Sequence, residues 1–252
     1  MSLVAAKIVV TPALMWVVSA AARRWGSLVG GLLSGLPLTS APISIYLAIE
    51  QGEQFASDAA VGSVTGLGAV ALAYMAYALC APRVSSSRAV GAGLLAFLGG
   101  GFILHSVIHP GVWVMAALDV VLMVLVIALC PLSGQAVGRA RPPRWDMPAR
   151  LGAATLLVVL VSTLAPYLGP ALSGVLAPIP VISWPLIVFA RVQTGVAASL
   201  DVVRGSVQGA FGVLAFYLCL YMTLGQISIV LAYTLSITLS VALVMPWLFV
   251  RR

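Results

Sequence analysis

The chain alternates between long apolar runs and short polar connections. A helix needs about 20 apolar residues to cross the hydrocarbon core of a bilayer, and runs of about this length follow one another from end to end. We therefore predict an all-α polytopic membrane protein with about nine transmembrane helices. The predicted spans are residues 3–22, 28–49, 58–80, 89–108, 111–130, 150–168, 171–190, 202–222 and 226–250.

The division of one run and the retention of the first run each need a further argument. His109-Pro110-Gly111 divides one long run into two spans, and without this division the count becomes eight. The first run lacks the basic leader of a secretory signal, so we expect it to be retained as the first helix.

Composition supports the membrane assignment. Hydrophobic residues make up 62% of the 252 residues and charged residues 8%, whereas about 25% of a soluble domain is charged. The nine spans leave little of the chain over, which excludes a fused ATPase, a receptor ectodomain and a nucleic-acid-binding module.

The basic residues predict the orientation. Twelve of the thirteen are arginines, and with nine spans all twelve fall on one side, while Glu50, Glu53 and Asp58 fall on the other. Cytoplasmic connections are rich in Lys and Arg, so we predict an external N-terminus and a cytoplasmic C-terminus in the bacterial cytoplasmic (inner) membrane. The basic stretch 138–144 either signals this topology or contacts lipid headgroups.

The chain contains an internal repeat. At a constant offset of 143 residues, the segment 52–74 matches the segment 195–217 at eight positions, and a shorter match at an offset of 139 lies upstream. The matching residues of the first segment are Gly52, Asp58, Gly62, Ser63, Val64, Gly66, Val70 and Tyr74.

This repeat predicts the domain organisation. Residues 1–108 form a first repeat of helices 1 to 4, residues 109–148 a linker helix with a basic loop, and residues 149–252 a second repeat of helices 6 to 9. Equivalent helices are five spans apart, which is an odd number, so the two repeats have inverted topology. Inverted repeats are a common architecture of secondary transporters.

Prolines cluster in the second and seventh predicted helices. Each proline removes a backbone donor and frees a carbonyl group, and within a membrane such groups are tolerated only where protein or a water-filled cavity satisfies them. We expect two broken helices that meet at a pseudo-two-fold axis and line a substrate path; kinks in tightly packed helices are the alternative. The predicted substrate-binding residues are Pro37, Thr39, Ser40, Pro42, Pro178, Pro180, Ser183, Trp184 and Pro185.

Three aspartates are candidates for proton coupling. Asp119 lies in the middle of an apolar run, where an ionised carboxylate costs about 2.5 to 3.5 kcal/mol, so we expect it to be protonated, paired or facing a cavity. Asp58 and Asp201 precede GxxxG pairs, which predict close helix packing, and we expect both on that packed face. Capping or pairing near a membrane boundary, with Arg204 as the partner of Asp201, is the alternative for these two.

Other chemistry is poorly represented in the sequence. His105 and His109 have the spacing of a metal-binding pair, but no third ligand is nearby, and the three cysteines are widely spaced. We expect no metal and no cofactor. The sequence has no paired carboxylates, no Ser/His pair on facing helices and no DDxxD-like motif, so we expect no catalytic residues and no enzymatic activity.

The stretches 25–42, 52–66 and 172–185 resemble a widespread group of bacterial inner-membrane proteins. Each half is also similar to the small four-helix GlpM-like membrane proteins, with a Gly-containing and then Pro-rich second helix. The overall plan resembles the drug/metabolite transporter superfamily, whose members have inverted repeats, although its larger transporters have ten spans where this chain has nine. The resemblance implies the fold and transfers no binding residue.

These features predict a secondary transporter that moves a small or amphipathic solute by alternating access, with proton coupling as one source of energy. A lipid flippase or scramblase with a lipid-like substrate is the alternative, and a membrane-embedded enzyme is a third hypothesis. We expect the solute and membrane lipids as partners, and no nucleic acid.

Overall fold

The computed structural model describes residues 32–33, 36–108, 111–131 and 145–249, with four single residues nearer the N-terminus. This part of the chain is all-α. Its helices are α3 (Ser40–Gln51), α4 (Glu53–Cys80), α5 (Ser86–Ile103), the π-helix η1 (Leu104–Ile108), α6 (Val112–Leu129), α7 (Asp146–Leu176), α8 (Ser183–Thr194), α9 (Val196–Thr223) and α10 (Ile229–Phe249).

Six of these helices are long and apolar enough to cross a membrane, so the chain is a multipass membrane protein. They are α4, α5 with the start of η1, α6, α7, α9 and α10. α5 and α6 are separate candidate spans, which confirms the division expected at 109–111. The predicted first span, 3–22, lies almost wholly outside the described residues, so the number of nine spans stays a prediction.

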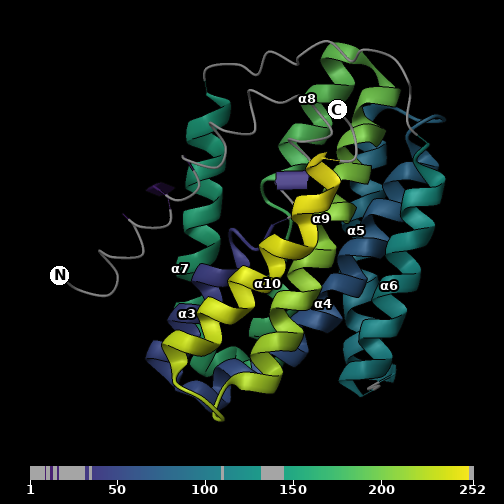
Figure 1. The fold of residues 1–252 in the computed structure, drawn as a ribbon. Helices are drawn as coiled ribbons and strands as arrows, with labels where there is room; N and C mark the ends of the chain where they lie inside the picture. The colour runs from purple at the N-terminus through teal and green to yellow at the C-terminus, as the bar shows by residue number, and fades with distance from the viewer. Residues whose placement is uncertain are drawn as a thin grey trace.

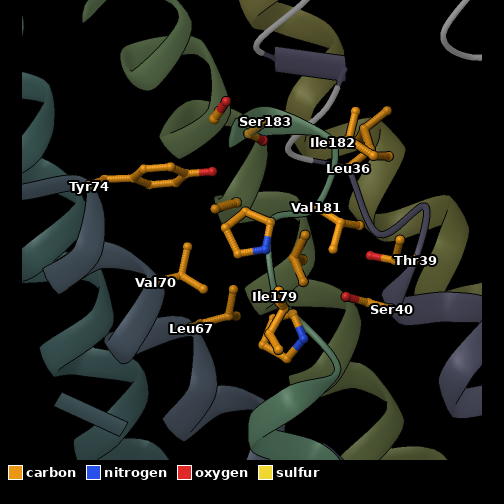
Figure 2. A pocket seen from close by; sticks show the side chains of 15 residues that line it. Leu36, Thr39, Ser40, Leu67, Val70, Tyr74, Ile179, Val181, Ile182 and Ser183 are labelled. Atoms are coloured by element: carbon orange, nitrogen blue, oxygen red, sulfur yellow. The ribbon is translucent and has the colours of Figure 1, made fainter. Parts of the chain in front are cut away.

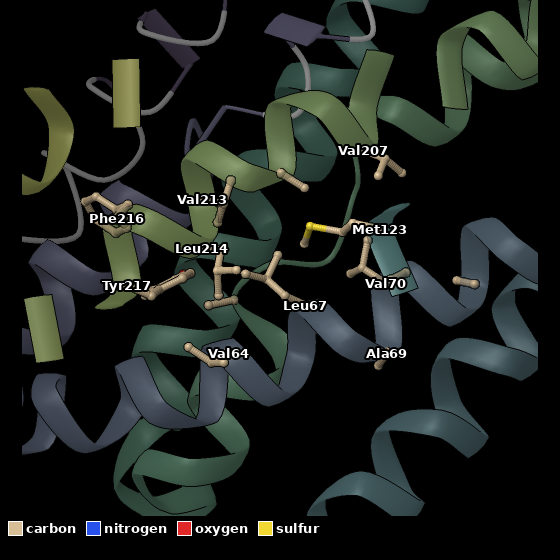
Figure 3. Packing of buried hydrophobic residues seen from close by; sticks show 14 of the residues in the cluster. Val64, Leu67, Ala69, Val70, Met123, Val207, Val213, Leu214, Phe216 and Tyr217 are labelled. Carbon is tan, nitrogen blue, oxygen red and sulfur yellow. The ribbon is translucent and has the colours of Figure 1, made fainter. Parts of the chain in front are cut away.

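α4 and α9 form the centre of the bundle (Figure 1). In the apolar window of each, 72% and 67% of positions are buried, against 28–39% for the other four spans. Figure 3 shows apolar side chains of α4 and α9, including Leu67 and Leu214, packed in one cluster. The outer spans carry apolar residues on exposed faces, such as Leu95 and Phe102 on α5. This distribution is typical of helices that face lipid.

Two helix pairs have the same dimensions. α3 and α8 each contain 12 residues, and α4 and α9 each contain 28. Gly52 joins the first pair with φ 94°, and Gly195 joins the second with φ 108°. Pro42 and Pro185 both stand in the first turn of the short helix, α3 or α8. An N–H group in the first turn has no partner within the helix, so its absence from proline costs no helical hydrogen bond. Every one of these positions keeps the offset of 143 residues.

The two pairs point in opposite directions. α3 lies at the end of the bundle where α9 joins α10, whereas α8 lies at the other end (Figure 1). The described arginines gather at the end near α8: Arg191 donates to the Val84 carbonyl in the α4–α5 turn. Arg204 donates to the carbonyls of Ile127 and Cys130, at 2.8 and 2.7 Å, where α6 ends.

The proline-rich segments interrupt the predicted second and seventh helices. Residues 36–39 form a turn before α3, and residues 177–182 are non-helical between α7 and α8. α7 itself bends at Gly169, with φ 72°, immediately before Pro170. At about 1.5 Å per residue, the 12 residues of α3 and α8 reach only partway through a bilayer. Both predicted breaks are therefore present in the structure.

Small residues bring α4 against the last turns of α7. A Cβ atom added to Gly66 would lie 2.5 Å from the Val175 carbonyl oxygen, and one added to Gly62 would overlap Ala171. Ser63 Oγ donates to the Gly174 carbonyl at 3.1 Å. The packing role predicted for the GxxxG pair of α4 is confirmed.

A central cavity between two helix breaks

A cavity lies at the centre of the bundle, where the two interrupted helices meet α4 and α9 (Figure 2). Its volume is about 40 Å³, enough for about three water molecules. Both breaks contribute to its wall, together with one face of each central helix. The lining residues are Leu36, Thr39, Ser40, Leu67, Val70, Tyr74, Pro178, Ile179, Pro180, Val181, Ile182, Ser183, Ser206, Ala210 and Val213.

Two helix N-termini reach this cavity. Ser40 begins α3 and Ser183 begins α8, and both side chains are buried. The N-terminus of a helix carries a partial positive charge, whereas an amide in the first turn of each of these helices already donates to a carbonyl of the preceding break. In Figure 2, Thr39 and Ser40 lie on one side of the break residues Ile179 and Val181, and Ser183 lies on the other. The two helix dipoles and the two serine hydroxyl groups thus favour a hydrogen-bond acceptor in the cavity.

Two tyrosines make reciprocal contacts between the halves of the chain. The hydroxyl of Tyr74 on α4 interacts with Ser183 and with Ser206 of α9. The hydroxyl of Tyr217 on α9 faces Ser40 of α3 and Ser63 of α4. Each contact maps onto the other by the offset of 143 residues. Both tyrosine side chains are almost fully buried, with 2% and 1% of their surface exposed.

The two hydroxyl groups differ in one respect. Although Tyr217 lies within reach of its two serines, its hydroxyl makes no hydrogen bond of regular geometry to any residue in the described part of the chain. The Tyr74 hydroxyl has no such deficit. One of two equivalent polar groups is therefore satisfied and the other is not.

The predicted site residues fall into two groups. Thr39, Ser40, Pro178, Pro180 and Ser183 line the cavity, so the structure brings residues of both breaks together as expected. The remaining four are Pro37, Pro42, Trp184 and Pro185, and within the described chain they are not part of the lining. The binding of a substrate by either group stays a prediction.

Trp184 has a packing environment instead. Its indole lies against the rings of Tyr74 and Tyr77, with centroids 5.8 Å apart in each pair. A Cβ added to Gly93 on α5 would come within 2.5 Å of the indole. Trp184 thus fills space between α8, α4 and α5, and it holds the Tyr74 ring in place beside the cavity.

The three aspartates occupy different surroundings. Asp58 is exposed and accepts a hydrogen bond from Gln54 at 3.1 Å, so the expectation that it points into the packed face of α4 is wrong. It stands one helical turn before Gly62, at an exposed position. Asp201 is buried and lies near Cys130 and Arg204. Asp119 is fully buried in the middle of α6.

The tyrosines and the serines of α4 and α9 were not predicted as site residues. A signal for them exists in the sequence, because Ser63 and Tyr74 are the two hydroxyl-bearing residues among the eight that repeat at an offset of 143. The other repeated residues include glycines and valines, which packing alone explains. A repeated hydroxyl group within an apolar helix requires a partner.

His105 lies in η1, and His109 is outside the described residues. Within the part of the chain that the structure covers, no group of three His, Cys, Asp or Glu side chains could hold a metal ion.

No family model, no curated protein and no solved structure matches this chain. The resemblance to GlpM-like proteins and to the drug/metabolite transporter superfamily therefore stays a prediction. The protein is established by its own helices as a helical, multispan membrane protein.

Proposed function

We propose that this protein is a secondary transporter that moves a small solute through the central cavity by alternating access. The observation that carries the proposal is the reciprocal pair of contacts, Tyr74 with Ser183 and Ser206, and Tyr217 with Ser40 and Ser63. When each of two equivalent residues contacts the equivalents of the other's partners, the two halves are related by a two-fold axis.

The orientation of that axis supports inverted repeats. α4 and α9 are equivalent by offset and run in opposite directions (Figure 1). A two-fold axis that relates antiparallel spans lies in the plane of the membrane, as in many secondary transporters. On this basis the predicted spans 1–4 and 6–9 are inverted copies. The end of the bundle that carries Arg191 and Arg204 then faces the cytoplasm.

Two halves with the same packing favour two conformations of similar energy. One conformation becomes the other when the halves exchange roles, and each opens the cavity to one side of the membrane. The cavity volume of about 40 Å³ is below the ~300 Å³ of a typical ligand site, so the halves would have to move apart to admit a solute.

The lining favours one class of solute. It combines apolar side chains with hydroxyl groups and two helix N-termini, and among the described residues it includes no Lys, Arg, Asp or Glu. A multiply charged ion has no countercharge there and is disfavoured. A solute with an apolar part and one acceptor group, either neutral or a single carboxylate, fits the two N-termini best.

The test begins with binding. Purified protein is screened by thermal melting against neutral and monocarboxylate metabolites, because a solute that binds the native state raises the melting temperature. Solutes that do so are then tested in proteoliposomes for counterflow, the exchange of labelled for unlabelled solute. Counterflow of at least one of them is expected.

Matched variants connect any transport to this cavity. Ser40→Ala and Ser183→Ala each remove a hydroxyl from the lining and should weaken solute binding several-fold, while Ser85→Ala, in the exposed α4–α5 turn, should not. Equal transport by all three variants would contradict the proposed path. Movement of labelled phospholipids in the absence of solute counterflow would favour the flippase instead.

A further inference from the structure

Asp119 faces α4 from the middle of α6. A Cβ atom added to Gly68 of α4 would lie 2.7 Å from Asp119 Oδ1, so the carboxyl group occupies the space that this glycine leaves open. The other atoms near that point belong to Leu104, the first residue of η1, and to Met115. The carboxyl group therefore lies in an apolar setting between three helices.

Neither carboxyl oxygen of Asp119 has a hydrogen-bond partner among the described residues. The side chain is 0% exposed. A buried ionised carboxylate without a partner is among the least favourable groups in a protein interior, whereas the protonated form has no net charge to desolvate. The surroundings of Asp119 thus select the form that carries a proton.

The ionisable groups on the neighbouring helices have partners or positions elsewhere. On α9, Arg204 donates to carbonyls at the end of α6, and Asp201 lies with it near Cys130. On α4, Tyr74 interacts with Ser183, and Tyr77 packs against Trp184. On η1, His105 follows the residue that contacts Gly68, and Arg88 lies at the far end of α5.

α4 connects this carboxyl group to the central cavity. Gly68 faces Asp119, and its neighbours Leu67, Val70 and Tyr74 line the cavity. Loss of the proton would leave a charge that needs water or a countercharge, so the contact between α4 and α6 would have to open at Gly68. η1 adjoins the same point, and π-helical turns occur frequently at functional sites. Protonation of Asp119 therefore biases the position of a helix that forms the cavity wall.

We propose that Asp119 is the binding site of a coupling proton, which is bound in the conformation described here. The proposal rests on the proposed transport function and adds the coupling ion to it. The proton enters from water on one side of the membrane, is held on a carboxyl oxygen while α4 packs against α6, and returns to water on the other side after α4 moves. Asp58, which is exposed and hydrogen-bonded to Gln54, lacks the burial that such a site requires.

Infrared spectroscopy of the purified protein in lipid nanodiscs tests the bound proton without a solute. We expect a C=O stretching band of a protonated carboxyl group at neutral pH, which shifts in protein made with isotope-labelled aspartate and moves again in D₂O. The band should be absent from Asp119→Asn, retained at a changed frequency in Asp119→Glu, and unaltered in Asp58→Asn. A spectrum without this band, or the same band in Asp119→Asn, would overturn the proposal.

Transport under a pH gradient tests the coupling. For a solute found in the melting screen, wild-type proteoliposomes should accumulate it when a pH gradient is imposed, whereas Asp119→Asn should keep counterflow and lose accumulation. Accumulation by Asp119→Asn at the wild-type level would overturn the coupling and leave the transport function intact. If wild-type protein shows the infrared band and no counterflow of any solute, the transport function fails, and with it the role of the proton in coupling.

Discussion

Gly174, near the end of α7, lies so close to Gly62 of α4 that a Cβ atom added to Gly174 would fall 2.9 Å from the Gly62 Cα atom. The two backbones are in contact, and Ser63 adds a hydrogen bond to the Gly174 carbonyl. This contact fixes the last turns of α7 against a central helix. It therefore determines where the break at 177–182 begins and where the cavity lies.

The first prediction concerns this contact. Gly62→Leu and Gly66→Leu should each lower the free energy of unfolding by about 3 kcal/mol or more, because the new side chain has to displace the backbone of α7. Gly99→Leu on α5, where no atom lies within 4 Å of an added Cβ, is the matched control and should fold normally. Melting in detergent measures all three. Normal stability with lost transport in Gly66→Leu would instead assign that glycine to the solute path.

A second prediction separates the two tyrosines. Tyr74→Phe removes a hydroxyl that interacts with Ser183 and Ser206, so it should cost about 1 kcal/mol of stability. Tyr217→Phe removes a buried hydroxyl that makes no regular hydrogen bond to a described residue, so stability should be unchanged or slightly higher.

The same pair tests the conformational cycle. If the halves exchange roles, the Tyr217 hydroxyl forms its bonds to Ser40 and Ser63 in the opposite conformation. Tyr217→Phe should then slow counterflow about as much as Tyr74→Phe does, despite its normal melting temperature. Wild-type counterflow by Tyr217→Phe would speak against the exchange.

The sequence was sufficient to predict helices and helix breaks that depend only on residues within the same segment. Clustered prolines remove several backbone donors at once, so the clusters around Pro37 and Pro178 predicted both breaks, whereas the single Pro246 stands inside α10. Long apolar runs likewise predicted α4, α5, α6, α9 and α10 to within six residues at each end. The orientation of individual side chains around these helices was less predictable.

Asp58 and Trp184 illustrate the reason. Asp58 precedes a glycine pair that packs as expected, and Trp184 follows a serine that lines the cavity. Whether a side chain is covered depends on neighbours that are distant in sequence. Asp58 is exposed one turn before Gly62, and Trp184 packs against α5. Tyr217 meets Ser40 across more than 170 residues of chain, and only the arrangement of the two halves brings them together.

The third prediction tests the orientation in the membrane. In a variant without the native cysteines Cys80, Cys130 and Cys219, we introduce single cysteines in place of Glu53 and Arg88, which lie at opposite ends of the bundle. An impermeant thiol reagent added to intact cells should label the cysteine at 53 and should reach the one at 88 only after lysis. Labelling of both from the same side would contradict the orientation, and with it the inverted repeats.

A fourth prediction concerns the arginine at the end of α6. Arg204 donates to the carbonyls of Ile127 and Cys130, which a helix C-terminus leaves without partners. Arg204→Met should lower stability by about 2 kcal/mol, because hydrogen bonds from a charged donor are stronger than neutral ones. Arg88→Met, at an exposed position of the same end of the bundle, should change stability by less than about 0.5 kcal/mol. Equal effects would show that charge, rather than the hydrogen bonds, matters at position 204.

The last prediction concerns the two glycines that join each half-helix to its central helix. Gly52 has φ 94° and ψ 164°, and Gly195 has φ 108° and ψ −177°. This region of backbone conformation is almost restricted to glycine, because a Cβ atom clashes with the chain's own carbonyl groups. Space is not the obstacle, since no atom lies within 4 Å of a Cβ added at either position. Gly52→Ala and Gly195→Ala should therefore each cost about 1 to 3 kcal/mol of stability, and the two costs should be similar. Gly111→Ala is the control, because that residue has φ −58° and equally open surroundings, and it should be close to neutral. If only one of the two turns tolerates alanine, the two helix pairs are not energetically equivalent, and the balance between two conformations that alternating access requires would have to arise elsewhere in the molecule.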